Sequence, residues 1–254
     1  LSGKVGVCIG TSGPGATNLI TGIATAYMDS IPMVIITGQV RTNMIGRDVF
    51  QEVDITGATE SFTKHSYLVK DAKELPRIVK EAFYIASTGR PGPVLIDIPF
   101  DIQETEIDYV YPKTVDIRGY KPTTKGHAGQ IKRALKAMAE SKKPLIVAGG
   151  GIMLSKSQNE FIAFAEKTGI PVVHTLMGKG VLPSYHPLYM GMVGTHGNVQ
   201  ANKAAAEADL LLFIGARIAD RASGATDIVP ENVRIIHIDV DPAEIGKNLG
   251  TQIP

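Results

Sequence analysis

The stretch Val5-Gly6-Val7-Cys8-Ile9-Gly10-Thr11-Ser12-Gly13-Pro14-Gly15-Ala16-Thr17-Asn18 decides the fold of the first part of the chain. An apolar run from Val5 to Ile9 leads into a glycine-rich turn and then into helical spacing, which predicts a strand, a tight loop and a helix start. Gly13 and Gly15 permit unusual backbone angles and Pro14 fixes one φ, so the loop is stiff. Free N–H groups at a helix start suit an anionic ligand or a close-packed neighbour, but an ordinary strand-to-helix turn has the same pattern. The stretch matches neither G-x-G-x-x-G nor a P-loop, so it identifies no ligand by itself.

The same alternation of short apolar runs and helical spacing continues to Pro99 and is typical of a parallel sheet covered by helices. The predicted strands are Val5–Ile9, Met33–Thr37, Ser66–Val69 and Val94–Ile98. The predicted helical faces are formed by Leu19, Ile23, Ala26 and Tyr27, and by Leu75, Ile78, Val79, Ala82, Phe83 and Ala86. The irregular segment 38–54 follows the end of a strand, which is the sheet edge where open α/β sheets bind ligands.

A second unit of the same kind follows. Its predicted strands are Leu145–Ala148, Val172–Thr175, Leu210–Ile214 and Arg234–Asp239, and its predicted helical faces are Ile131, Leu135 and Met138, and Phe161, Ile162 and Ala165. Gly149 to Gly151 are predicted as a turn. We therefore expect an α/β protein with two tandem doubly wound parallel-sheet units, residues 1–104 and 126–254, joined by a linker at 105–125 that lacks a sustained period.

The composition limits the classes of function. With 44% hydrophobic and 20% charged residues, the 254-residue chain has enough apolar material for packed cores. Its net charge of +1 argues against nucleic acid or an anionic membrane as the main partner. The one cysteine, Cys8, is predicted to be a small buried hydrophobe rather than a nucleophile, and its isolation fits a reducing cytoplasm. No signal segment and no apolar run of about 20 residues is present, which predicts neither export nor a membrane span.

Polar side chains follow two predicted strands of the second unit. Asp239 stands where nucleotide-binding sheets place an acid on ribose hydroxyls, although capping ahead of Pro242 explains it equally well. Arg217 and Arg221 follow another strand, and their guanidinium groups suit a phosphate or a carboxylate. A surface salt bridge with Asp220 is the alternative for Arg221.

Two further groups stand out. His196 lies in the glycine-flanked stretch Gly194–Gly197, which would let a ligand approach the backbone. The six histidines lack metal-ligand spacing, so we expect no metal site in this chain. Phe50 and Gln51 place an aromatic ring beside an amide in the irregular segment, while for Glu52 a surface or helix-start role is favoured over catalysis.

Several motifs together resemble one family, that of the acetolactate (acetohydroxyacid) synthase large subunit. They are Gly10 to Asn18, Ile36-Thr37-Gly38-Gln39-Val40, Asp48-Val49-Phe50-Gln51-Glu52, Thr63-Lys64-His65, Gly89-Arg90-Pro91-Gly92-Pro93-Val94, Thr175-Leu176-Met177-Gly178 and Asp220-Arg221. The family is thiamine diphosphate dependent and has a pyrimidine-binding, a central and a pyrophosphate-binding domain. The resemblance implies that residues 1–104 are the later part of the first domain and that residues 126–254 are an incomplete central, FAD-binding-like domain.

The resemblance also implies roles for residues. Gln51 would lie beside thiamine diphosphate, Phe50 would line the substrate entry, and Arg221 would hold the carboxylate of the second 2-oxo acid. FAD, which does no redox work in the family, would be bound by Ser30, Arg90, Gly151, Thr175, Leu176, Gly194, His196, Gly215, Arg217 and Asp239. The glycine turn at residues 11–18 would then shape the thiamine pocket and pack at a dimer interface rather than hold a phosphate.

The sequence departs from the family pattern at four places. Arg41-Thr42-Asn43 stands where Pro-Arg-Arg is common, and Phe100 replaces a lysine. Thr195 replaces a methionine, and Ala219 an aspartate. By the resemblance the first three lie where substrates enter, so a related carboligase acting on glyoxylate or another aldehyde acceptor is an alternative.

We expect an internal fragment of an acetolactate synthase, which condenses two pyruvates, or pyruvate and 2-oxobutyrate, with decarboxylation in branched-chain amino acid biosynthesis. The activating glutamate and the Gly-Asp-Gly segment that binds Mg²⁺ would lie outside this chain, so the isolated fragment is predicted to be inactive. The resemblance implies a homodimer or homotetramer, with a regulatory small subunit as a further partner. A non-catalytic nucleotide-binding module is the other interpretation of the chain as given.

Overall fold

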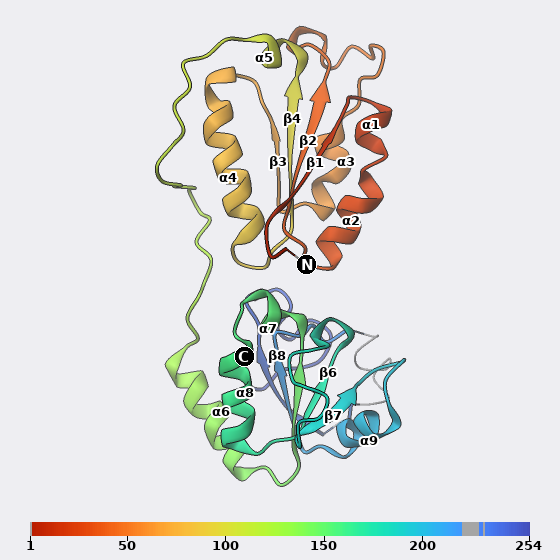
Figure 1. Cartoon of the computed structure of the whole chain (residues 1–254), viewed down its shortest axis with the longest axis vertical. Coiled ribbons are helices and arrows are strands. Elements are labelled where there is room, and N and C mark those ends of the chain that lie inside the picture. The colour runs from red at the N-terminus through yellow and green to blue at the C-terminus, as the bar shows by residue number, and fades with distance from the viewer. Residues whose placement is uncertain (1, 220–228, 231) are drawn as a thin grey trace. The chain divides into compact units, whose positions relative to one another are not determined.

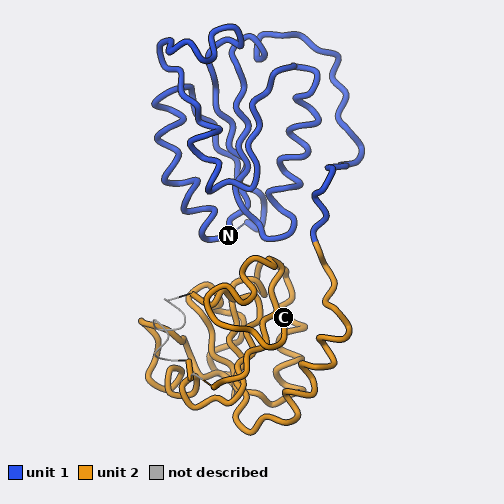
Figure 2. The backbone as a smooth tube through the Cα atoms, turned by 180° about the vertical axis from the view of Figure 1, so that it is seen from behind, with its two compact units in different colours: residues 1–122 blue, residues 123–254 orange. Residues whose placement is uncertain are grey.

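The computed structural model describes residues 2–219, 229–230 and 232–254, which form two compact units, residues 1–122 and 123–254 (Figure 2). Each unit contains one parallel sheet with helices on both faces (Figure 1). The predicted α/β class with two parallel-sheet units is confirmed. No helix in the described ranges is long and apolar enough to cross a bilayer.

The first unit is built on a four-stranded sheet with the order β1-β2-β4-β3, in which every pairing is parallel. Its strands are β1 (Gly6–Gly10), β2 (Met33–Gln39), β3 (His65–Leu68) and β4 (Pro93–Pro99). Its helices are α1 (Pro14–Thr17), α2 (Ile20–Met28), α3 (Ile55–Thr59), α4 (Leu75–Ser87) and α5 (Phe100–Glu104), and its short 3-10 turns are η1 (Thr42–Met44), η2 (Glu60–Phe62) and η3 (Ala72–Glu74).

Consecutive residues of the central strands supply two separate cores, because successive side chains of a strand point to opposite faces. Val34 and Val94 pack with the apolar face of α4. Ile35 and Leu95 pack instead with α2 and α3, whose Ile23 and Ile55 are almost completely buried. The continuous apolar runs of β2 and β4 are therefore explained by burial on both faces.

The edge strand β1 differs from the prediction. Its Val7 and Ile9 are 55% and 74% exposed, and Cys8 is only half-buried rather than buried. The reason is the position of β1 at the edge of the sheet, where fewer side chains surround it than surround β2 and β4. An apolar run alone does not distinguish a central strand from an edge strand.

The second unit has a five-stranded parallel sheet with the order β7-β6-β5-β8-β9. Its strands are β5 (Pro144–Ala148), β6 (Val172–His174), β7 (Tyr189–Met192), β8 (Leu210–Ile214) and β9 (Arg234–Ile238). Its helices are α6 (Ala128–Glu140), α7 (Gly150–Leu154), α8 (Gln158–Thr168) and α9 (Val199–Glu207), with a 3-10 turn η4 (Leu176–Gly178).

Two predictions for the second unit are wrong in detail. Ile131 and Leu135 are 52% and 55% exposed, and α6 contacts the core through Ala134, Ala137 and Met138. The face of α6 that carries these alanines therefore packs on the core, and Ile131 and Leu135 lie outside that face. The residues predicted as a glycine turn instead begin a helix, since Gly149 is the N-cap and α7 starts at the next residue.

The segment that follows α5 is packed along the first unit. Ile107, Ile117 and Tyr120 contact the core beneath α4. The Lys64 ammonium donates to the carbonyl oxygen of Thr88 (2.6 Å) and to the Tyr120 hydroxyl (3.0 Å). The Lys80 ammonium donates to the carbonyl oxygens of Pro112 and Lys113 in the same way. Two lysines therefore fasten an extended segment that has little secondary structure of its own.

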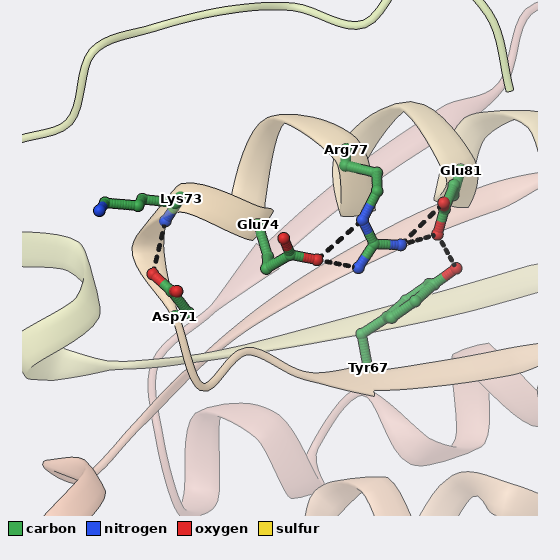
Figure 3. Close-up of polar contacts among 6 residues, drawn as sticks. All are labelled: Tyr67, Asp71, Lys73, Glu74, Arg77 and Glu81. Carbon is green, nitrogen blue, oxygen red and sulfur yellow. Dashed lines mark hydrogen bonds and ion pairs between the residues drawn. The ribbon is translucent and has the colours of Figure 1, made fainter.

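A buried carboxylate connects β3 with α4. Glu81 is only 6% exposed, and it accepts hydrogen bonds from the Tyr67 hydroxyl (3.0 Å) and from the Arg77 guanidinium (2.8 Å), which also binds Glu74 (Figure 3). Burial and donation to Glu81 raise the pKa of Tyr67. Burial also lowers the pKa of the adjacent His65. The carboxylate is therefore held on two sides, as a buried charge requires.

Tyr67→Phe removes one of the two donors to Glu81 and should lower the free energy of unfolding by about 1 kcal/mol, because the carboxylate keeps Arg77. Urea unfolding measures the change. Tyr84→Phe on α4 is the matched control, since that residue packs edge-on against Tyr120 and keeps its ring contact. Equal stabilities of the wild type and Tyr67→Phe would contradict this account of Glu81.

Candidate functional site at the carboxyl edges of the two sheets

Two loops and one short helix meet at the carboxyl edge of the first sheet. They are the glycine loop 11–13 after β1, the segment 40–54 after β2, and α5 after β4. A Cβ placed on Gly38 would lie 3.5 Å from the Ser12 nitrogen and 3.7 Å from the Gln103 side chain. Because parallel strands end at a common edge, these sequence-distant loops become neighbours where ligands bind in such sheets.

The glycine loop contacts Gln51 directly. A Cβ on Gly13 would lie 2.9 Å from both the Cβ and the carbonyl oxygen of Gln51, and Gly13 also has a φ of 58°. Only glycine therefore fits, for two independent reasons. The glycine loop thus forms one wall against which the segment 48–52 packs.

Gln51 occupies a strained position. The Glu52 N–H donates to the carbonyl oxygen of Val49 (3.0 Å), which closes a turn whose third residue, Gln51, has a φ of 60°. Glycine or asparagine is usual there. Asp48 is strained as well, with a φ of 53°, and Phe50 at the turn is 88% exposed. Strained backbone of this kind is concentrated at ligand-binding and catalytic sites.

The Glu52 carboxylate organises the rest of this segment. It accepts hydrogen bonds from the backbone N–H groups of Gly46, Val49 (3.1 Å) and Arg47 (3.3 Å). These donors, Gly46 foremost, hold the pKa of the Glu52 carboxyl below its ordinary value. These hydrogen bonds favour the ionised carboxylate and tie it to the backbone of residues 46–49.

A second carboxylate lies beneath the loop. Asp97 is 1% exposed and accepts hydrogen bonds from the Thr37 hydroxyl (2.7 Å) and the Gln39 amide (2.9 Å). Burial raises the pKa of Asp97 to about 6, although both hydrogen bonds act in the opposite direction. The same Gln39 amide nitrogen donates to the carbonyl oxygen of Val53 (2.7 Å).

Two of the departures from the family pattern touch each other. The Arg41 guanidinium lies 4.8 Å from the centroid of the Phe100 ring and pairs with Glu104 at 2.8 Å. The Asp101 carboxylate accepts from the Thr42 N–H (2.9 Å). A cation is therefore present at this edge even though position 100 is aromatic.

The structure separates the predicted site residues of the first unit into two groups. Phe50 and Gln51 lie at the carboxyl edge. Ser30 and Arg90 meet at the opposite edge, just before β2 and β4, where the Arg90 guanidinium donates to the Ser30 hydroxyl (2.9 Å). The two pairs therefore do not belong to one pocket within this unit.

In the second unit, glycines mark the point where the strand order reverses, between β5 and β8. A Cβ on Gly149 would lie 2.1 Å from the carbonyl oxygen of Gly215. One on Gly151 would lie 2.7 Å from the Gly215 Cα, and one on Gly178 would lie 2.2 Å from the carbonyl oxygen of Ala148. These glycines are thus required by contact between loop backbones.

The remaining predicted FAD residues of this unit also follow strand ends. Leu176 after β6 is 70% exposed, and the neighbouring Thr175 hydroxyl accepts from the Gly178 N–H (3.2 Å). The Asp239 side chain is 11% exposed, and one of its carboxylate oxygens accepts from the Asp241 N–H (2.9 Å). Asp239 therefore forms an Asx turn with the Asp241 N–H.

His196 and Gly194 follow β7, and Arg217 follows β8. His196 is exposed, while Gly194 is buried and its backbone is bound on both sides by the Asn202 amide (2.9 and 3.0 Å). Arg217 is half-buried. Arg221 lies outside the described residues. Within the described ranges, no three His, Cys, Asp or Glu residues are grouped so that they could hold a metal ion.

Sequence reasoning did not single out Thr37, Gln39 and Asp97 as a connected group. The signal was present, because Asp97 interrupts the apolar run from Val94 to Ile98 and two polar residues end the apolar run of β2. A polar side chain inside a strand buried on both faces needs polar partners. Which partners it has could not be read without the register of β2 against β4.

Comparison with known proteins adds two family matches. Residues 1–58 match the thiamine pyrophosphate enzyme N-terminal TPP binding domain, and residues 131–254 match the thiamine pyrophosphate enzyme central domain.

Individual relatives align over the whole chain. It is 54% identical to a probable acetolactate synthase large subunit of Methanocaldococcus jannaschii, 51% to the acetolactate synthase large subunit of Corynebacterium glutamicum, and 50% to that of Haemophilus influenzae. These alignments include 100% of this chain but only 43%, 41% and 44% of the relatives. The chain thus spans less than half the length of the curated relatives it matches.

The raised pKa of Asp97 predicts a pH-dependent stability. Between about pH 4 and pH 6 the folded protein holds a proton that the unfolded chain releases, so the free energy of unfolding should fall as the pH rises through this window. The loss is on the order of 3 kcal/mol, since one pKa unit corresponds to about 1.4 kcal/mol. In urea unfolding at several pH values across this window, the wild type should lose about this much stability relative to Asp97→Asn as the pH rises, because the slopes of other carboxyl groups such as Glu52 are common to both proteins. If the free energies of unfolding of the two proteins changed in parallel with pH, Asp97 would not have a raised pKa.

Gly149→Ala places a methyl group against the Gly215 carbonyl oxygen and should destabilise the second unit by about 3 kcal/mol or more. Gly250→Ala is the control, because a Cβ there meets nothing within 4 Å, and a change below about 0.5 kcal/mol is expected. Chemical denaturation measures both. A Gly149→Ala variant as stable as the control would mean that the glycine is not needed for backbone packing.

Proposed function

Because the chain belongs to the thiamine pyrophosphate enzyme family, we propose that it is part of a thiamine diphosphate-dependent acetolactate synthase. The reaction joins the two-carbon unit left after decarboxylation of pyruvate to the carbonyl carbon of a second pyruvate or of 2-oxobutyrate. The strained turn at Gln51 is the observation that carries this proposal. Its φ of 60° is a conformation that a glutamine adopts at a cost, at a sheet edge suited to ligands.

The residues of this turn fit an aromatic heterocycle. Phe50 offers an exposed apolar ring, and the amide of Gln51 offers both a donor and an acceptor. Thiamine diphosphate, when bound, supplies the electron sink for decarboxylation and the nucleophilic carbon for the second step. Gln51 would orient the cofactor, Phe50 would exclude water beside the substrate, and Arg221 would hold the carboxylate of the second 2-oxo acid. Mg²⁺ would be bound outside this chain.

The second unit fits a dinucleotide such as FAD. The carboxyl edge carries the Asp239 carboxylate for ribose hydroxyls, the Arg217 guanidinium for a phosphate and the exposed Leu176 for an apolar ring. Gly151 lies at the start of α7, and Thr175, Gly194, His196 and Gly215 lie in the loops after β6, β7 and β8 at that edge. By the family resemblance, FAD would also be bound by Ser30 and Arg90.

We propose a homodimer or homotetramer in the cytoplasm, with a regulatory small subunit as a further partner, by analogy with relatives whose names include a large subunit. A second candidate follows from the chain's length relative to its relatives: by itself it would be a non-catalytic nucleotide-binding module. The contact of Arg41 with Phe100 favours a further alternative, a carboligase with a different acceptor, because it changes the edge beside the turn.

The test begins with acetolactate formation from pyruvate, with thiamine diphosphate, Mg²⁺ and FAD present. The full-length gene product should be active and residues 1–254 alone inactive. Glyoxylate and 2-oxobutyrate, offered as acceptors, distinguish the alternative carboligase. A full-length product that forms no carbon–carbon bond with any of these acceptors would exclude the proposed function.

Gln51→Gly should raise the apparent Kd for thiamine diphosphate at least about tenfold in the full-length protein while leaving the thermal midpoint unchanged or higher. Glycine relieves the positive φ, which costs roughly 1 kcal/mol for other residues, but it removes the amide. Asp48→Gly is the matched control, because it relieves similar strain in the same segment and should leave cofactor binding unchanged. Isothermal calorimetry and thermal unfolding supply the two readouts; unchanged affinity in Gln51→Gly would remove this residue from the cofactor site.

A further inference from the structure

The buried side-chain amide of Gln39 binds both ends of the segment 40–53, which carries the Phe50–Gln51 turn. The Gln39 side-chain oxygen accepts from the Val40 N–H (2.8 Å) at the start of the segment. Its nitrogen donates to the Val53 carbonyl oxygen (2.7 Å) at the end. Gln39 is 7% exposed, so these bonds are largely shielded from water.

Asp97 fixes which way this amide points. Its carboxylate oxygen accepts the second hydrogen of the Gln39 nitrogen (2.9 Å), while its other oxygen is occupied by the Thr37 hydroxyl (2.7 Å). Above about pH 6 the Asp97 carboxylate accepts and does not donate, so the amide nitrogen must face Asp97. The same orientation turns the nitrogen to Val53 and the oxygen to Val40.

We propose that Gln39, oriented by Asp97, is a positioning residue that holds the Phe50–Gln51 turn in its cofactor-binding conformation. The role in cofactor binding rests on the proposed function of that turn. Two contacts restrain the turn. Gly13 packs against Gln51, and Gln39 binds the carbonyl oxygen of Val53, shortly after the turn. A turn with positive φ at Asp48 and Gln51 would relax if one anchor were removed.

The test compares substitutions of the two residues that donate to the Asp97 carboxylate. Gln39→Met keeps the length of the side chain but removes the bonds to Val40, Val53 and Asp97. Thr37→Val removes one donor to Asp97 and leaves the connection from Gln39 to Val53 intact, so it is the matched control.

A third variant guards against general destabilisation. In Gln39→Glu combined with Asp97→Asn, the introduced amide at position 97 can donate to the introduced carboxylate at position 39, so a buried hydrogen bond between the two positions is retained. That carboxylate cannot donate to the Val53 carbonyl oxygen, because both groups are acceptors. This variant therefore breaks the loop anchor selectively.

In the full-length protein, hydrogen exchange reports whether the turn is held, and the KM for thiamine diphosphate reports whether the held turn binds the cofactor. Hydrogen exchange of the peptide covering residues 44–53 should rise at least about fivefold in Gln39→Met and in the double variant, and less than about twofold in Thr37→Val. The KM for thiamine diphosphate should rise about tenfold in the first two, with a smaller fall in kcat at saturating cofactor, and should be unchanged in Thr37→Val.

Unchanged exchange in Gln39→Met, or an equal rise in Thr37→Val, would overturn the positioning role. Faster exchange with an unaltered KM would show that Gln39 holds the turn but that the turn does not bind the cofactor. In that case the proposed function of Phe50 and Gln51 fails and the anchor remains. Faster exchange together with a raised KM in both anchor variants supports the whole proposal.

Discussion

Both units depend on one constraint. To place the next strand parallel to the last, the chain must cross back over a face of the sheet to the end where the last strand began. Val34 and Ile35 illustrate it, since neighbouring residues of β2 serve different cores. Helices therefore occupy both faces, and every loop after a strand is delivered to one edge. That edge brings the glycine loop, the segment after β2 and α5 together in the first unit, and Gly149 and Gly215 together in the second.

Glycines at such an edge have two physical explanations, and the positions of the neighbouring atoms decide between them. One explanation is that glycine lets a ligand approach the backbone, and the other is that it lets two protein segments pack closely. At Gly149 and Gly178, however, the space that a Cβ would need is filled by other loop backbone, and at Gly13 it is filled by Gln51. These glycines thus allow protein segments to pack closely against one another.

Sequence patterns predicted the fold class and eight of the strands to within about two residues, because a strand buried on both faces has a continuous apolar run. They missed β7, whose residues Tyr189 to Met192 include a glycine at an edge, and they misplaced the buried face of α6, where alanines rather than Ile131 and Leu135 meet the sheet. Family motifs suggested Phe50 and Gln51, but the strain at Gln51 and its contact with Gly13 depend on tertiary packing and have no local signature.

The buried Asp97 carboxylate lowers the stability of the folded first unit. Burial raises its pKa to about 6, so above that pH the folded protein contains a carboxylate that would be better solvated in water. An apolar residue would avoid this cost but would leave the Gln39 nitrogen short of an acceptor and free to turn away from Val53. Strain at Asp48 and Gln51 adds to the cost. Asp97 orients the Gln39 amide, and that amide anchors Val53 next to a turn whose backbone is strained at Asp48 and Gln51. Strain that the surrounding structure maintains in this way is typical of functional sites.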